Sequence, residues 1–406
     1  MLFPEALFYH GLERAILLSS QAYFIRVLAD YVNGRKTEQP PEDSKQLHSI
    51  ARSQQLQSIC YAQCRSFLPS QWEEEFAAIL HRSVNRKFLS QKIAEALNAE
   101  KIPFAFVKGH EIEKLYTPVA MRTMGDTDII IHPQDRQRAH SVMTDLGFQC
   151  AEMGESEWIY RQNGLCFEVH DCMLHPHKGN EQLVRFFNNL WSYGLERDGA
   201  FHLDWNFHFC YLIQHISGHV IMTGIGFRQF LDIVMVVKKV ELNWDWIRNQ
   251  LEKLGLKDFA DICYALCERW FDFRFPFETP PLEEDFFQEA TEKMFHDGVF
   301  GQENPGNKKL AGLVERQIYG GEKSTTGSKL SLLVEKLFPP YPTMRRLPYC
   351  QFLEGRRALL PIAWLWRWIY LLFVKRKGIS EVKEQAQAMD TGLAKERVAY
   401  LRKWGL

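Results

Sequence analysis

Residues 121–131, with the sequence Met-Arg-Thr-Met-Gly-Asp-Thr-Asp-Ile-Ile-Ile, decide the fold of this chain. The three isoleucines predict a buried β-strand, in which alternate side chains point to the same face. Asp126 and Asp128 therefore point together, while Thr127 points away. Two adjacent carboxylates repel each other unless a cation lies between them, and Mg²⁺ prefers such oxygen ligands. The pattern predicts a divalent-cation site; a turn with a capping aspartate is the alternative.

A third carboxylate follows on a later strand. In the run Cys166-Phe-Glu-Val-His170, Phe167 and Val169 would face the core, so Glu168 and His170 face the other way. Asn163-Gly164, directly before this strand, predicts a two-residue hairpin turn. Because hard divalent cations take several oxygen ligands, Glu168 completes a site with the two aspartates.

The residues around this motif predict a small α/β module. Strands are expected at 102–107, 128–132, 158–161 and 165–169, with helices at 111–116 and 133–146, in the order β-α-β-α-β-β. Apolar residues at helical spacing precede and follow the module, for example over 71–100, 205–220 and 227–240. The stretch 71–100 is expected to form a one-sided amphipathic helix whose apolar residues include Leu80, Val84 and Phe88. The expected fold is α+β, with an N-terminal helical region (1–100), a core with a small mixed β-sheet (101–200) and a C-terminal helical region (201–406).

Composition excludes several classes of protein. The 406 residues carry a net charge of -1, which argues against non-specific binding of nucleic acid by the whole chain. Among the nine cysteines, the pairs Cys60/Cys64 and Cys263/Cys267 have helical spacing and are expected in the core as reduced thiols, which favours the cytoplasm. The N-terminus lacks the pattern of a secretory signal, and no P-loop, dinucleotide-binding or nucleophile-elbow motif occurs.

The most apolar stretch is 358–374, Ala-Leu-Leu-Pro-Ile-Ala-Trp-Leu-Trp-Arg-Trp-Ile-Tyr-Leu-Leu-Phe-Val. It contains Pro361 and Arg367 and is shorter than the roughly 20 apolar residues needed to span a bilayer, so no transmembrane span is expected. A buried terminal helix is the main prediction. A weak interfacial contact with a membrane, helped by Lys375-Arg376-Lys377, is the alternative. Residues 301–328, rich in Gly, Asn, Lys and Ser, predict a mobile loop.

Three motifs together resemble the nucleotidyltransferase superfamily of the DNA polymerase β type. They are Lys108-Gly109, then Gly125-Asp-Thr-Asp128-Ile-Ile-Ile131, then Phe167-Glu-Val-His170. Within it, the chain is most similar to the bacterial family of uncharacterised nucleotidyltransferases. His215, His219, Arg228 and Asp232 resemble the helical half of that family. Many superfamily members carry Gly-Ser where this chain has Gly109-His110, so a serine that would contact the γ-phosphate is replaced.

The resemblance implies transfer of a nucleoside monophosphate from an NTP such as ATP to an acceptor, with release of pyrophosphate. Asp126, Asp128 and Glu168 would then be the catalytic residues that hold Mg²⁺ or Mn²⁺. Lys108, Gly109, Arg122, Gly125 and Arg228 would bind the nucleotide, with His170 and Asp232 as accessory residues. A small-molecule acceptor is favoured over a nucleic acid because the chain is nearly neutral.

Smaller predictions concern the helical half. Arg228 and Asp232, four residues apart, are expected to form a salt bridge on one helix face. His215 and His219 have the spacing of zinc ligands, but core packing is favoured. Two other functions remain open: a non-catalytic nucleotide-binding or regulatory protein of the same fold, and a toxin that adds nucleotides to tRNA. The toxin predicts a basic groove near the carboxylates.

Overall fold

The computed structural model describes residues 5–154, 156–175, 181–222, 224–299, 318, 337–345, 347–373 and 391–406; in the first helix, side chains are described from Ser19 onward. The predicted loop at 301–328 lies outside these residues except for Ile318, and so does the basic run 375–377.

A five-stranded mixed sheet forms the centre of the module, in the order β1-β2-β5-β4-β3. Only β2 and β5 pair in parallel, whereas the other neighbours are antiparallel. The strands are β1 Phe104–Phe106, β2 Asp126–Ile131, β3 Gln149–Met153, β4 Glu157–Gln162 and β5 Leu165–His170. The predicted α+β class with a small mixed sheet is confirmed.

The strand β3 was not predicted, so the predicted β-α-β-α-β-β order is wrong by one strand. This strand lies at the sheet edge, and four of its five residues are exposed. An edge strand exposed on both faces needs no apolar alternation, which is the signal that sequence reasoning uses. A separate hairpin of β6 (Gly194–Arg197) and β7 (Ala200–Leu203) was also missed. The turn at Asn163-Gly164 is confirmed, because both residues have positive φ, 52° and 72°.

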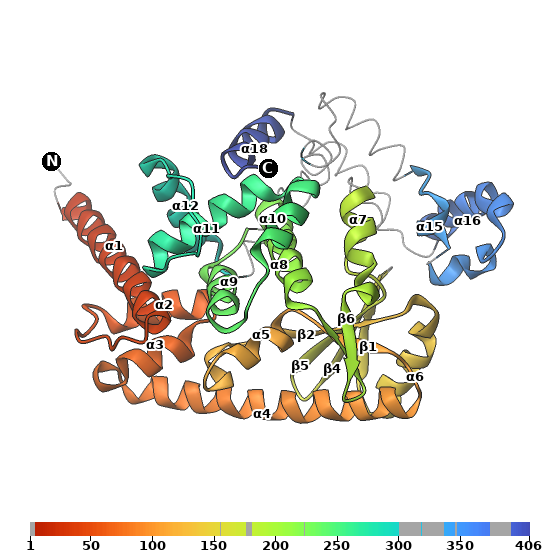
Figure 1. Ribbon diagram of the computed structural model, residues 1–406, viewed down its shortest axis with the longest axis horizontal. Helices are drawn as coiled ribbons and strands as arrows, with labels where there is room; N and C mark the ends of the chain where they lie inside the picture. The colour runs from red at the N-terminus through yellow and green to blue at the C-terminus, as the bar shows by residue number, and fades with distance from the viewer. Residues whose placement is uncertain are drawn as a thin grey trace.

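One face of the sheet is covered by two helices, α4 (Ser70–Ala99) and α6 (Arg136–Asp145). In Figure 1, α4 runs along the bottom of the molecule beneath the sheet. Ile129, Ile131, Phe167 and Val169 belong to the core between this face and the helices. The opposite face, which carries Asp128 and Glu168, is thereby left for the functional site.

The long helix α4 departs from the one-sided amphipathic helix that the sequence predicts. Trp72, Leu89, Ile93 and Leu97 are buried at helical spacing. Leu80, Val84 and Phe88 were expected on the same side, but they are exposed at 43%, 60% and 56%. They lie on a face of the helix that no other described element covers.

Helices from both ends of the chain share the largest apolar core. The ring of Phe24 in α1 packs against Phe227 in α9, with centroids 5.9 Å apart. All nine cysteines are free, and Cys60, Cys64, Cys263 and Cys267 are buried as predicted. These helices are α1 Glu5–Val32, α2 Ser44–Ser53, α3 Gln57–Cys64, α8 Trp205–Met222, α9 Phe227–Lys239, α10 Trp244–Lys253, α11 Lys257–Phe271 and α12 Glu284–Asp297.

The predicted buried terminal helix is α16, Leu360–Phe373, and this prediction is wrong in one respect. Only one face of α16 is covered, since Ala363 is fully buried while Ile362 and Leu365 are 58% and 64% exposed. Within the described part of the chain, no helix is both long and apolar enough to cross a membrane.

Candidate active site

The parallel pairing of β2 and β5 brings the predicted carboxylates together. Asp128 lies directly opposite Glu168, and Ile130 lies opposite His170. The buried residues Thr127 and Phe167 point to the other face. The side chain of Asp128 is 5% exposed and that of Glu168 is 21% exposed. Asp126 lies on the same face, two residues earlier and more exposed.

Asp128, Glu168 and His170 form a cluster in which one ligand atom of each lies within 4.8 Å of the others. His170 Nε2 lies 2.9 Å from Asp128 Oδ1 and 3.5 Å from Glu168 Oε2. Among the described residues this is the only group of three or more that could hold a metal ion. His170, predicted as an accessory residue, therefore lies in the centre of the cluster.

The pKa shifts follow from the three carboxylates lying side by side in the cleft. Asp126 is the most exposed of the three, yet desolvation in the cleft, followed by repulsion from Asp128 and Glu168, raises its pKa. Burial opposes the charged form of His170, but its hydrogen bonds with Asp128 and Glu168 outweigh burial and raise its pKa to about 9. Burial would likewise raise the pKa of Asp128, but Lys108 and His170 lower it. Such a cluster is stabilised by added positive charge.

Lys108 supplies one such charge. Its Nζ donates to Asp128 Oδ1 at 2.6 Å, and although burial disfavours its charge, this carboxylate raises its pKa. The backbone of Lys108 has φ 48°, which is unfavourable for a residue with a side chain. Its N–H donates to Nε2 of His208 at 3.0 Å. Burial lowers the pKa of His208 to about 4, so the ring is neutral and accepts this bond.

Arg122 is bound by a carboxylate from the helical half. Its Nε and Nη2 donate to the two oxygens of Asp232 at 2.8 and 2.7 Å, and Tyr116 donates to the same group at 2.8 Å. All three residues are buried. The predicted salt bridge between Arg228 and Asp232 is therefore wrong. Helical spacing allowed it, but the tertiary fold gives Asp232 a bidentate partner from the core module.

Arg228 instead donates to the carbonyl of Thr123 at 2.9 Å and to Gln55. Burial, and then repulsion from Arg122, lowers its pKa to about 10. Within the described part of the chain its Nε has no hydrogen-bond partner. Arg228 thus brings a positive charge to the site without a bound carboxylate.

Gly109 leaves room for the Arg122 side chain. A Cβ at this position would lie 2.7 Å from Arg122 Nη1 and 3.2 Å from Met124 Cε. Its neighbour His110 stacks on Phe106, with ring centroids 4.0 Å apart, and its Nδ1 lies 3.2 Å from Glu111 Oε1. The residue that replaces the superfamily's serine therefore packs against the sheet.

One cleft of about 300 Å³ collects these side chains. Its wall includes nine of the residues that the sequence predicted: Lys108, Gly109, Arg122, Gly125, Asp126, Asp128, Glu168, Arg228 and Asp232. Helices α8 and α9 add further residues to the wall, namely Leu212, His215, Ile216, His219 and Gln229. A cleft of this size is typical of small-molecule sites.

Two of the wall residues, His215 and His219, are the pair with zinc spacing. Their Nε2 atoms are 3.2 Å apart, and burial, then His219, lowers the pKa of His215 far below its usual value. No group of three ligands includes them among the described residues.

Two residues near the site were not predicted from the sequence. His208 accepts the hydrogen bond from the Lys108 N–H, and Glu157 Oε2 lies 3.5 Å from His170 Nδ1. Each meets its partner only through the fold, so no local pattern marks it.

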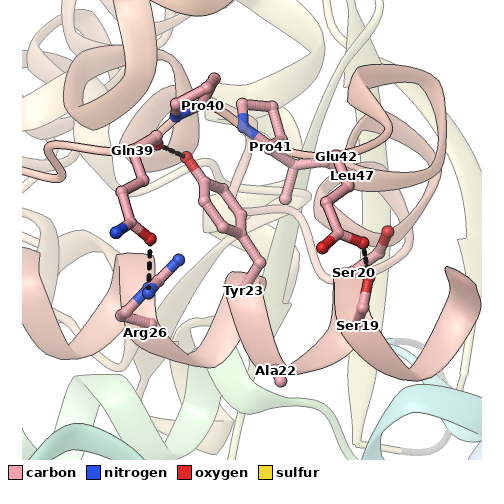
Figure 2. Close-up of a pocket in the computed structure, with 10 residues that line it drawn as sticks. All are labelled: Ser19, Ser20, Ala22, Tyr23, Arg26, Gln39, Pro40, Pro41, Glu42 and Leu47. Carbon is pink, nitrogen blue, oxygen red and sulfur yellow. Dashed lines mark hydrogen bonds between the residues drawn. The ribbon is translucent and has the colours of Figure 1, made fainter.

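A second cavity, of about 380 Å³, lies between α1 and the segment before α2 (Figure 2). It shares no residue with the cleft. Tyr23 donates to the carbonyl of Gln39 at 2.7 Å, Arg26 to the Gln39 side chain at 3.2 Å, and Ser19 to Glu42 at 2.5 Å (Figure 2). Since these polar groups already bond to one another, the carboxylate cleft remains the candidate site.

Comparison with known proteins agrees with this geometry. A family described as "Uncharacterised nucleotidyltransferase" matches residues 40–272, which is more than half of the chain. The chain therefore belongs to this nucleotidyltransferase family, and the matched range contains every residue of the carboxylate cluster. Neither a curated protein nor a solved structure matches it.

Proposed function

We propose that the protein is a metal-dependent nucleotidyltransferase that moves a nucleoside monophosphate from an NTP to an acceptor hydroxyl and releases pyrophosphate. The observation that carries the proposal is the register of β2 and β5, which sets Asp128 opposite Glu168 in a cleft also lined by Lys108 and Arg228. The region 101–200 would then be the catalytic core.

The donor set fits a divalent cation. Asp126, Asp128 and Glu168 offer carboxylate oxygens on one face, and burial, followed by their mutual repulsion, raises the pKa of Asp126. A bound Mg²⁺ or Mn²⁺ would stabilise negative charge on the transferred phosphate. His170 Nε2, 2.9 Å from Asp128 Oδ1, would orient this carboxylate toward the ion.

The cations of the cleft would bind the triphosphate. Lys108 and Arg228 are the two whose charge is not already held by a bidentate partner. Arg122 is held by Asp232, so we assign it a positioning role beneath Gly109. Glu168 is more exposed than Asp128. It would take the proton of the acceptor hydroxyl while the oxygen of that hydroxyl attacks the α-phosphorus.

A small acceptor suits the cleft better than a nucleic acid. Four carboxylates and three basic side chains line it, which is not the basic groove expected of a tRNA-modifying toxin. The nine free thiols support the cytoplasm as the place of action.

The test is thermal melting of the full chain with each NTP, with and without Mg²⁺ or Mn²⁺. A ligand at about 100 times its Kd stabilises the fold by about 2.7 kcal/mol. We expect a metal-dependent shift that Asp126→Asn/Asp128→Asn abolishes. The matched control, Glu73→Gln/Glu74→Gln, removes two exposed carboxylates from α4 and should keep the shift.

The outcomes separate the proposal from its rivals. A shift that survives in the aspartate variant would contradict the metal site. A metal-dependent shift without NTP hydrolysis, and without transfer to any of a panel of sugars and nucleosides, would favour the non-catalytic nucleotide-binding protein. The observation that supports this rival is His110, which stands where many superfamily members have a serine and packs on Phe106.

A further inference from the structure

The helix α16 belongs to a small unit whose core is separate from the carboxylate cleft. Ala363 packs with Met344, Cys350 and Leu353, all fully buried. Trp364 Nε1 donates to the carbonyl of Pro339 at 2.7 Å. These contacts fix which face of α16 points inward.

The opposite face of α16 is a stripe of large apolar side chains. Ile362, Leu365, Trp366 and Ile369 are 58%, 64%, 45% and 39% exposed. Their spacing of three, one and three residues places them on one side of the helix. The indole Nε1 of Trp366 donates to the carbonyl of Tyr349 at 3.2 Å, so its polar end is bonded while its ring stays exposed. A contiguous apolar face of this kind marks an interaction surface.

The charge around this stripe is strongly positive. Residues 345–377 contain eight Lys or Arg residues and a single acidic residue, Glu354, whereas the whole chain has a net charge of -1. Arg356 and Arg357 are exposed directly before α16, and Lys375, Arg376 and Lys377 follow it closely in the sequence. Arg356 and Arg357 thus place positive charge beside the start of the apolar stripe.

The dimensions suit the surface of a bilayer. The helix has 14 residues, too few to span about 30 Å of hydrocarbon. It is also rich in tryptophan and tyrosine, with Trp364, Trp366, Trp368 and Tyr370 in two turns, and these residues favour the headgroup region. In Figure 1, α16 lies at the edge of the molecule, away from α4 and the sheet.

We propose that α16 is a peripheral membrane-binding surface that lies on anionic lipid bilayers. Leu365, Ile369 and Trp366 enter the headgroup and acyl boundary, while Arg356 and Arg357, exposed directly before the helix, contact anionic headgroups. A nucleic acid would also meet positive charge, but exposed Ile and Leu side chains contribute nothing to phosphate binding. Lipid therefore accounts for both properties of the surface. This inference does not depend on the proposed nucleotidyltransferase activity.

The test is flotation of the full chain with phosphatidylcholine vesicles, with and without phosphatidylglycerol. We expect at least tenfold stronger partition onto the anionic vesicles. Leu365→Glu/Ile369→Glu should lower that partition at least tenfold with little change in Tm, because both side chains are exposed. Arg356→Glu/Arg357→Glu leaves the apolar stripe intact and should weaken binding to anionic vesicles at low salt. At high salt this difference should disappear, because salt screens the attraction between exposed charges.

The matched control lies on α4. Val84→Glu/Phe88→Glu replaces two apolar residues that are also exposed, in a helix that carries four acidic and four basic residues. Partition of this variant should equal that of the wild type. The proposal is overturned if the wild-type chain floats with neither vesicle, or if the α16 and α4 variants behave alike. It is also overturned if the α16 surface proves to bind RNA, or a second copy of the chain by light scattering, and no lipid.

Discussion

Arg122 and Lys108, two of the three cations predicted to bind the nucleotide, have different kinds of partner in the structure. Arg122 is buried and makes two hydrogen bonds to Asp232, which also accepts one from Tyr116. Lys108 makes one bond to Asp128, a carboxylate that also bonds to His170. The first pair has both carboxylate oxygens bonded, so it holds the core module and the helical half together. We expect the second pair to be exchangeable, because a metal ion bound at Asp128 would replace the ammonium group.

The largest expected effect comes from breaking the complete pair. Arg122→Met leaves Asp232 buried and without its main partner, which we expect to destabilise the fold by about 3–5 kcal/mol. Urea unfolding measures the change. The matched variant Lys108→Met, in the exchangeable pair, should cost far less, and an equal loss for the two would remove the distinction between them.

The next effect is the pH dependence of stability that the neutral ring of His208 causes. His208 has a pKa of about 4 in the folded protein, lowered by burial, with Lys108 and Lys114 acting in the same direction and Glu111 against it. The unfolded state binds a proton near pH 6.5, so stability falls as pH drops from about 6.5 toward 4. The expected loss is roughly 2 kcal/mol between pH 7 and 5. His208→Gln should be less stable at pH 7 but should lack this part of the pH dependence in urea titrations.

A smaller effect follows from the space beside Gly109. Gly109→Ala would place a Cβ 2.7 Å from Arg122 Nη1, a group that Asp232 prevents from moving freely. We expect a loss of about 1–3 kcal/mol, typical of overpacking. The control is Gly218→Ala in α8, where a Cβ meets nothing within 4 Å and alanine favours the helix. Thermal melting that shows equal shifts for the two variants would contradict this account.

The smallest effect on stability is expected for Lys108→Met. Ligand binding to this variant tests whether a metal ion can replace the lysine at Asp128. Without the ammonium group, Asp128 keeps only His170 as a hydrogen-bond partner among the described residues, so Mn²⁺ should bind about tenfold more tightly in the absence of nucleotide. The Kd for NTP should rise, since a phosphate-binding charge is lost. Calorimetry gives both constants, and weaker Mn²⁺ binding would show that Lys108 does not compete for the site.

The features that were predicted correctly depend on local sequence patterns, and those that were missed do not. Alternation along 126–131 and 165–170 was enough to place Asp126, Asp128 and Glu168 on one face, because side-chain direction in a strand has period two. The helices predicted at 71–100, 205–220 and 227–240 end within two residues of their observed bounds, because apolar residues recur along them with a 3.6-residue period. The helices α7 (Glu181–Asn188) and α12 were not predicted. The edge strand β3 escaped because its exposed residues carry no period.

The sequence alone therefore determined the α+β fold, the carboxylate face and the family to which the chain belongs. Only the tertiary structure decided that Asp232 binds Arg122, 110 residues away, and not Arg228 on its own helix. It alone decided that His208 supports Lys108 and that one face of α16 stays exposed. The physical reason is that periodicity fixes where a side chain points, whereas its partner depends on which distant segment packs there.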